Sequence, residues 1–396
     1  MGPRAALLIG VALAVLAVLA LGAISSDVPA APRPLRMAPL GQDRRPTTAG
    51  TIFLGNLESQ LGWVQKEVER EPDSVHAQRM LASLLATRGK YRGDIEQIQE
   101  ALDAVDTCLE IEPNNADLWL ERAGHAQALH RFAEARDDVE HAVALGARGR
   151  NVDDLVQELD WNDGNYVAAI ASIRDARSSF AALARVAQLE HDLGNMEAAD
   201  RAFEAAEDRM ADVSPLPLAW LYVERGRHEL DRGETARAVA FLREAVARAP
   251  GYIPAEEHLA EALNGLGHTD EAIARYRNIV ERSPDPEFMG ALAALLREAG
   301  NTKEADRLAA RARAGYEELL RRWPEAMYWH AAEFFLGEGK DPKRALALLE
   351  KNIAVRPNGE SWAALARAQR ANGDERAVRF SMDMARATPI AFAYDQ

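Results

Sequence analysis

The sequence predicts an all-α protein, and two observations support that fold class. Residues 219–250 and 253–284 each contain two amphipathic helical patterns, and the two patterns meet at a glycine, Gly233 or Gly267. In both segments apolar residues recur at the three- and four-residue spacings of a helix face. The composition agrees, because the abundant Ala, Leu, Arg and Glu residues favour helices over strands.

The two segments are copies of one unit with a period of about 34 residues. Equivalent pairs in the two copies are Gly226 and Ala260, Gly233 and Gly267, Ala238 and Ala272, Leu242 and Tyr276, Ala245 and Ile279, and Pro250 and Pro284. This pattern resembles the tetratricopeptide repeat, a helix–turn–helix of that length with small residues at fixed places. The resemblance implies an α-solenoid of helix-turn-helix units that coils into a right-handed superhelix.

The N-terminal residues 1–25 precede this array and are strongly apolar. An uncharged run over residues 5–24 follows Arg4 and is just long enough to span a bilayer as a helix. It is either a transmembrane anchor or a signal peptide cleaved after the small residues 23–25. Both alternatives place the rest of the chain outside the cytoplasm, periplasmic or secreted, and the first tethers it to the inner membrane. Arginines just beyond the run weakly oppose this orientation.

Residues 26–50 are rich in Pro and Arg and show no apolar period, so we expect a flexible tether. The array then occupies residues 51–389, with about nine units, two of them degenerate. A lone helix over residues 57–70 precedes the first full repeat. The halves of that repeat are about seven residues too far apart, which predicts roughly two extra helical turns near residues 93–99.

Later units deviate in two further places. One copy is recognised only by Gly164, Tyr166 and a few alanines. Beyond Pro284, the next proline that ends a unit, Pro324, arrives late, so the second helix there is expected to continue to Arg322. In the C-terminal tail, residues 390–396, apolar residues alternate. That tail either covers the end of the stack or binds a partner as an extended segment.

Composition and motifs argue against several functions. The formal net charge of −15 disfavours nucleic-acid binding, which depends on clustered Lys and Arg. The single cysteine, Cys108, excludes an intrachain disulfide framework and reads as a small core residue. The chain contains no HExxH, Gly-rich phosphate loop or GxSxG motif. We therefore expect no catalytic residues and no cofactor.

No metal site is expected either. Residues 160–164 faintly resemble a calcium loop, but the glycine comes early and the final glutamate is missing, so Gly164 is better explained as a turn between helices. His125, His130 and His141 read as surface or packed histidines. The acidic residues 137, 138 and 140 read as a solvated outward face.

The resemblance also implies a binding surface. In this family the first helix of each pair lines a concave groove, where ligand peptides lie. Trp220, Met327 and Phe334 would be apolar anchors there, and arginines would bind carboxylates in bidentate fashion. The groove-facing residues expected from the resemblance are Gln127, Gln188, His191, Trp220, Arg227, Asp231, Glu257, Glu261, Asn264, Arg297, Met327, His330, Phe334, Arg367 and Arg370.

These observations favour a non-enzymatic scaffold that holds a partner protein or peptide in the concave groove, in envelope assembly, secretion or a membrane complex. The alternative is a structural subunit of a permanent complex, joined through the ends or convex face of the array. An enzyme would need a site assembled from scattered groove residues such as His191, Asp231 and His330, and this is the least favoured interpretation.

Overall fold

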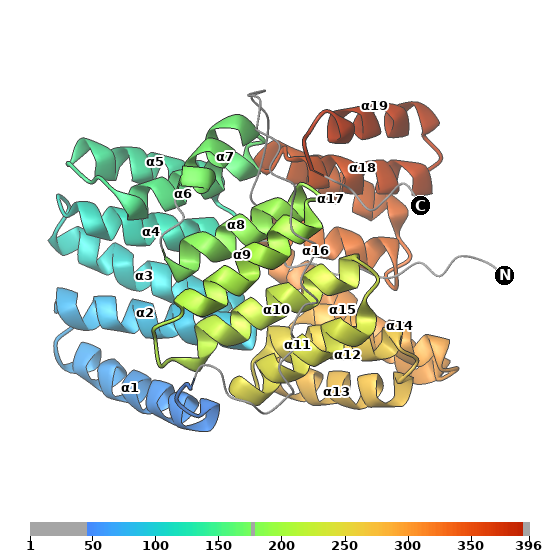
Figure 1. Ribbon diagram of the computed structural model, residues 1–396, viewed down its shortest axis with the longest axis horizontal. Helices are drawn as coiled ribbons and strands as arrows, with labels where there is room; N and C mark the ends of the chain where they lie inside the picture. Colours follow the sequence, from blue (N-terminus) through green and yellow to red (C-terminus); the bar gives the residue numbers. More distant parts are fainter. Residues whose placement is uncertain (1–45, 176–178, 391–396) are drawn as a thin grey trace, which may run out of the picture.

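The computed structural model describes residues 46–175 and 179–390, which form an all-α solenoid of helical repeats, with nineteen helices and no strand among them (Figure 1). The helices are α1 (Gly50–Arg70), α2 (Val75–Arg92), α3 (Ile95–Ile111), α4 (Ala116–Ala128), α5 (Phe132–Ala144), α6 (Arg150–Asn162), α7 (Tyr166–Asp175), α8 (Phe180–Asp192), α9 (Met196–Arg209), α10 (Pro215–Asp231), α11 (Thr235–Arg248), α12 (Ile253–Gly265), α13 (Thr269–Arg282), α14 (Pro286–Glu298), α15 (Thr302–Arg322), α16 (Pro324–Leu336), α17 (Pro342–Val355), α18 (Gly359–Ala371) and α19 (Glu375–Arg386).

From α2 onward the helices pack as successive hairpins, and α1 packs against α2. The repeated small residues explain how closely the two helices of a hairpin approach. A Cβ atom on Gly226 of α10 would lie 2.6 Å from the side chain of Leu242 on α11, so only glycine fits there. Gly267 joins α12 to α13 with φ of +83°, a left-handed conformation that other residues rarely adopt.

Two boundaries differ from the sequence-based prediction, and one agrees with it. α1 begins at Gly50 rather than at residue 57. The extra length predicted near residues 93–99 is shared between α2 (18 residues) and α3 (17 residues), because the chain turns at Gly93 with φ of +59°. As the late Pro324 predicts, α15 runs for 21 residues to Arg322.

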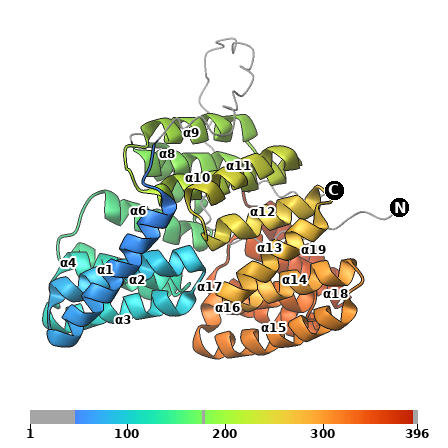
Figure 2. The ribbon, with the colours of Figure 1, turned by 90° about the horizontal axis from the view of Figure 1, so that it is seen from below.

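The solenoid closes on itself, which the repeat pattern did not reveal. Its N-terminal hairpins lie beside its C-terminal hairpins, and Figure 2 shows α2 and α3 next to α16 and α17. The contact begins before α1, where the backbone N–H of Thr48 donates to the carbonyl of Val213 at 2.7 Å. A Cβ atom on Gly50 would lie 2.3 Å from the carbonyl oxygen of Arg248, so α1 begins against the end of α11.

The same contact continues along the turns of the first three hairpins, and we call this row the seam. The Tyr91 hydroxyl at the end of α2 donates to the carbonyl of Pro250. The indole Nε1 of Trp323, between α15 and α16, lies 3.3 Å from Oε1 of Gln99 on α3. The backbone N–H of Gly359 donates to the Tyr166 hydroxyl of α7 at 2.6 Å. Each contact joins segments more than 150 residues apart.

Apolar burial stabilises the seam. Trp323 is 5% exposed and belongs to the same apolar cluster as the helices α2 to α6. In the opposite direction, Tyr91 and Tyr166 belong to the cluster formed mainly by α8 to α18. Each half of the chain therefore contributes aromatic side chains to the core of the other.

Several predictions concern residues that the structure does not describe. The apolar run at 5–24 and most of the tether lie outside the described residues, as do residues 391–396 of the tail. In the part of the chain that is described, no helix combines the length and the apolar character needed to cross a membrane.

Candidate functional site

The inner surface of the solenoid is built from the first helix of each hairpin, and every predicted groove residue lies on one of these helices. They are distributed as Gln127 on α4; Gln188 and His191 on α8; Trp220, Arg227 and Asp231 on α10; Glu257, Glu261 and Asn264 on α12; Arg297 on α14; Met327, His330 and Phe334 on α16; and Arg367 and Arg370 on α18.

The prediction that Met327 and Phe334 are apolar anchors for a partner is wrong, because other side chains of the protein cover both residues. Met327 is 8% exposed and packs in the seam, in the cluster of α2 to α6. Phe334 is 7% exposed, and its ring centroid lies 5.1 Å from that of Tyr316 and 5.3 Å from that of Phe335. Trp220 is partly buried against the larger apolar cluster. These three aromatic and apolar side chains stabilise the fold.

Arg297 and Arg367 already bind carboxylates of this chain, whereas Arg370 on α18 is exposed. Nη2 of Arg297 lies 2.8 Å from Glu338 and 2.9 Å from Asp306. Arg367 contacts both carboxylate oxygens of Glu333, one of them at 3.0 Å. Arg297 and Arg367 therefore make, within this chain, the bidentate contacts that were expected with a carboxylate of a partner.

A second group of predicted residues forms polar contacts with neighbouring side chains, both within a helix and between helices. The amide of Gln188 on α8 donates to Glu224 of α10 at 3.1 Å, and Arg227 pairs with the same carboxylate at 3.3 Å. Gln127 of α4 donates to Glu158 of α6. On α12, Asn264 accepts from the Thr269 hydroxyl at 2.9 Å.

His191 and Asp231 meet, as an assembled site would require, but His330 does not join them. Nε2 of His191 lies 3.1 Å from Oδ2 of Asp231, and its Nδ1 lies 2.9 Å from Nδ1 of His228. Burial lowers the pKa of His191, but Asp231 and Asp192 together raise it, and the net shift is upward. His330 instead pairs with Glu287 of α14 at 3.2 Å.

On α12 the predicted residues Glu257 and Glu261 converge on His258, which the sequence did not single out. Nδ1 of His258 lies 3.1 Å from Oε2 of Glu257 and 3.2 Å from Oε2 of Glu261. Burial raises the pKa of Glu257 to about 7. The Tyr276 hydroxyl of α13 donates to the other oxygen of Glu257 at 3.0 Å. This is the one group among the described residues whose His, Cys, Asp or Glu side chains could together hold a metal ion.

Sequence reasoning missed an open groove between α2 and α4, with a volume of about 840 Å³. Arg79 of α2 and Glu121 of α4 form an ion pair across it. The polar and small residues at helical spacing on α2 were the available sequence signal, but the long first repeat obscured their register. The residues lining this N-terminal groove are Val75, His76, Arg79, Met80, Ala82, Ser83, Ala86, Thr87, Lys90, Glu112, Leu120, Glu121, Gly124 and His125.

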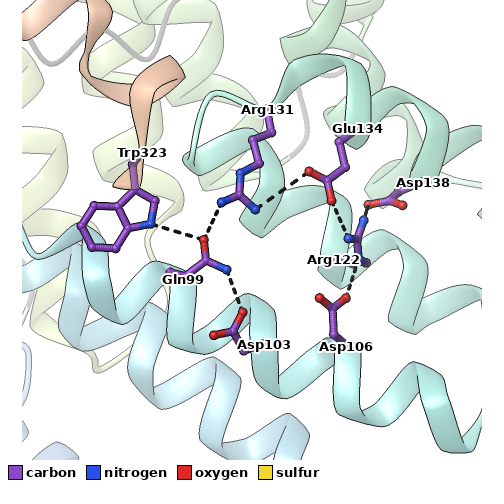
Figure 3. A network of polar contacts seen from close by, with 8 residues as sticks. All are labelled: Gln99, Asp103, Asp106, Arg122, Arg131, Glu134, Asp138 and Trp323. Atoms are coloured by element: carbon purple, nitrogen blue, oxygen red, sulfur yellow. Dashed lines mark hydrogen bonds and ion pairs between the residues drawn. The ribbon is translucent and has the colours of Figure 1, made fainter. Parts of the chain in front are cut away.

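Arg122 of α4 stands where the repeat usually has an apolar residue, and the structure explains it. Its guanidinium contacts Asp106 at 2.6 Å, Asp138 at 2.7 Å, and Glu134 (Figure 3). The prediction that Asp138 lies on an outward, solvated face is wrong. Asp138 is on α5 and is only 4% exposed, because its side chain faces Arg122 of α4. Desolvation raises the pKa of the Asp138 carboxyl to about 6.

Figure 3 shows that this cluster extends to the seam. Glu134 also pairs with Arg131, which donates to Gln99 at 2.6 Å, and Gln99 accepts from Trp323. A continuous polar network therefore links the interior of the second hairpin with the turn before α16.

The remaining motifs have structural explanations. Gly164 turns the chain between α6 and α7 with φ of +75°, and Asp160 and Asp163 both pair with Arg136 rather than converging as calcium ligands. Cys108 is fully buried, and burial raises the pKa of its thiol to about 11.

The three histidines considered for a metal lie in separate settings. His125 lines the N-terminal groove. The ring of His130 stacks on Phe132 with centroids 5.4 Å apart, and that of His141 packs on Trp119 at 4.4 Å. No group of metal ligands among the described residues includes them.

Comparison with known proteins gives one family match. Residues 229–295, from the end of α10 into α14, match the model of the tetratricopeptide repeat. No protein with a curated description matches the chain.

Solved structures that resemble the chain include the Naa15/Naa10 complex bound to HypK-THB, with 18% identity, a TM-score of 0.30, and coverage of 85% of this chain and 62% of that chain. Yeast Tom70 has 14% identity, a TM-score of 0.36, and coverage of 86% and 90%. The TPR domain of P58(IPK) has 14% identity, a TM-score of 0.29, and coverage of 85% and 94%. No partner or mechanism follows from likeness of this extent.

Proposed function

This chain is a tetratricopeptide-repeat protein, and from that premise we propose that it is a non-enzymatic scaffold that holds a segment of a partner protein in the N-terminal groove between α2 and α4. Proteins of this family are usually non-catalytic interaction scaffolds. Repeat arrays bind through extended surfaces that neighbouring units build together. A partner segment can therefore bind only where the inner surface is accessible to it.

The observation that carries the proposal is the contrast between the two ends of the inner surface. From α8 to α16 the predicted contact residues are buried, half-buried or paired with other side chains of the chain. On α18, Arg367 is paired with Glu333 and Arg370 is exposed beside a smaller hollow of about 430 Å³. Between α2 and α4 the first helices instead leave a groove of about 840 Å³. It combines apolar contact from Met80 and Leu120 with the exposed cation Lys90 at one end. An extended segment with apolar side chains and an acidic residue has matching chemistry.

The cellular setting we propose is the envelope. The apolar run at residues 5–24, followed by a Pro- and Arg-rich stretch, supports export with or without retention as an inner-membrane anchor. The scaffold would then act in envelope assembly, in secretion or in a membrane complex.

The test is a pull-down with the purified full chain against an envelope extract, read by mass spectrometry and followed by titration of each captured partner. Ser83 is exposed and lines the groove, so Ser83→Trp should fill it and weaken binding by more than about tenfold, the equivalent of about 1.4 kcal/mol. Ala133→Trp, at an exposed position on α5, is the matched control. Partners that bind Ser83→Trp as well as the wild type would contradict the proposal.

A second candidate, a structural subunit of a permanent complex, is favoured by one observation at the C-terminal end. Phe380 and Met384 on α19 are 59% and 38% exposed, so an apolar strip lies on the last helix of the stack. Phe380→Ser with Met384→Ser would release a partner held through that end and leave groove binding unchanged. Retention of every co-purifying protein by this double variant would count against the second candidate.

A further inference from the structure

We propose that Glu257, His258 and Glu261 form a binding site for one divalent transition-metal ion of the Zn²⁺ type. The ligand atoms are Oε2 of Glu257, Nδ1 of His258 and Oε2 of Glu261. The three protein ligands leave a fourth tetrahedral position for water. The inference is independent of the proposed groove, because α12 lies in the C-terminal half of the inner surface and shares no residue with α2 or α4.

The spacing of the ligand atoms matches a tetrahedral zinc site. Nδ1 of His258 lies 3.1 Å from Oε2 of Glu257 and 3.2 Å from Oε2 of Glu261, and the three ligand atoms lie within 4.8 Å of one another. Zinc binds carboxylate oxygen and imidazole nitrogen at bonds that place tetrahedral ligand atoms about 3.3 Å apart. One imidazole with carboxylates is also a ligand set that divalent transition metals accept.

A proton on His258 explains this arrangement less well than a metal ion does. An imidazole N–H carries one proton, and a good hydrogen bond needs that proton directed at one acceptor. Here Nδ1 meets hydrogen-bond geometry only with Glu261, while Oε2 of Glu257 lies at almost the same distance with no proton directed at it. A cation on the lone pair of Nδ1 contacts both carboxylates at once and neutralises their two negative charges.

The surroundings resemble the outer shell of a metal site. The buried Tyr276 hydroxyl donates to Oε1 of Glu257 at 3.0 Å, which turns Oε2 toward His258. Hydrogen bonds of this kind orient ligating carboxylates. The side chain of Glu261 is 22% exposed, against 9% for Glu257 and 7% for His258, and provides access.

Charged residues near the site have opposite effects on the binding of a cation. Arg227 of α10 acts on His258 as a positive charge and disfavours a second cation. Glu287 of α14 acts on Glu257 as a negative charge and favours one, although it also pairs with His330 of α16.

The experiment is a calorimetric titration of the chelator-treated full chain with Zn²⁺ alone. We expect one ion per chain in the wild type. Loss of an outer-shell partner costs about 10–100-fold in metal affinity, so Tyr276→Phe should weaken binding by about tenfold and His258→Gln or Glu261→Gln by more than about 100-fold. His268→Gln, at an exposed position on the next turn, should bind like the wild type.

A second measurement separates the proposal from folding defects in the variants. Co²⁺ added to the wild type should give the intense visible absorption of a tetrahedral ion, which Zn²⁺ abolishes in proportion to its binding. The inference is overturned if the wild type binds no Zn²⁺ below about 100 μM, if Co²⁺ gives only an octahedral spectrum, or if folded His258→Gln binds with unchanged affinity. Failure of this test leaves the Ser83→Trp result unaffected, so the two proposals are distinguishable.

Discussion

Replacing Arg122 with leucine should destabilise the protein strongly, although leucine is the residue that the repeat usually has there. The substitution removes the cation that contacts Asp138, Asp106 and Glu134. The side chains of Asp106 and Glu134 are 43% and 34% exposed, so water replaces the lost contact. That of Asp138 is 5% exposed and would be left as an uncompensated buried charge. Breaking a buried pair in this way costs about 3–5 kcal/mol.

A double variant tests the reasoning. Replacing both members of a buried ion pair with apolar residues is often neutral, so Arg122→Leu with Asp138→Leu should recover most of the loss. The single and double variants would therefore differ by more than about 2 kcal/mol in the free energy of unfolding, and the Asp138→Leu single variant completes the cycle that gives the coupling energy. Urea unfolding of the full chain at pH 7, followed by far-ultraviolet circular dichroism, measures each value.

The pH dependence of the same experiment follows from the Asp138 carboxyl, whose pKa desolvation raises to about 6. A carboxyl with a raised pKa in the folded state favours folding when protonated, and that contribution is lost as pH rises through 6. Without Arg122 the pKa should rise further, so the penalty of Arg122→Leu should be smaller at pH 5 than at pH 7. A penalty below about 1 kcal/mol at pH 7, or a double variant as unstable as the single one, would refute the argument.

Three further predictions concern the seam and two buried groups. Trp323→Ala should cost about 3–5 kcal/mol of unfolding free energy and increase the radius of gyration in small-angle scattering, because it removes one of the aromatic contacts between the two halves; an unchanged radius would show that the seam does not need it. Burial lowers the pKa of His130 to about 3, so the neutral ring stabilises the fold above pH 6.5 and that contribution is lost as pH falls toward 3. His130→Asn, which tolerates the φ of +57°, should therefore show a shallower loss of stability between pH 6.5 and 4 in urea titrations, and an identical slope would contradict this. Cys108, whose thiol pKa burial raises to about 11, should react with a thiol reagent only as fast as the chain unfolds, and rapid reaction of native protein would be inconsistent with its burial.

The fold class followed from local pattern, and the seam did not. The spacing of Gly226, Gly233 and Pro250 reflects close approach and turns within a hairpin, which a short window of sequence reports. Closure depends on contacts such as Tyr166 with Gly359, whose partners lie 193 residues apart and share no repeat position. A periodic pattern specifies neighbouring units and carries no information about where the coil meets itself.

The candidate surfaces were predicted only in part for the same reason. The repeat register correctly predicts which helices carry the groove residues, but it does not predict which of these residues are exposed. Phe334 has the register of an inner residue and is nevertheless buried against Tyr316. The convergence of Glu257 and Glu261 on His258 required side-chain positions, although their spacing on one helix was visible.

The seam has a consequence for how the chain is made. In an ordinary solenoid each unit is complete once its neighbour exists, so folding can follow synthesis. Here the contact of Tyr166 cannot form until Gly359, 193 residues further along the chain, has been synthesised. At about 5–20 residues per second, the delay is roughly 10–40 s. During that time the aromatic side chains at the edge of the first three hairpins are exposed to other nascent chains. Chaperones that bind incompletely folded chains can therefore bind there until the C-terminal hairpins are made.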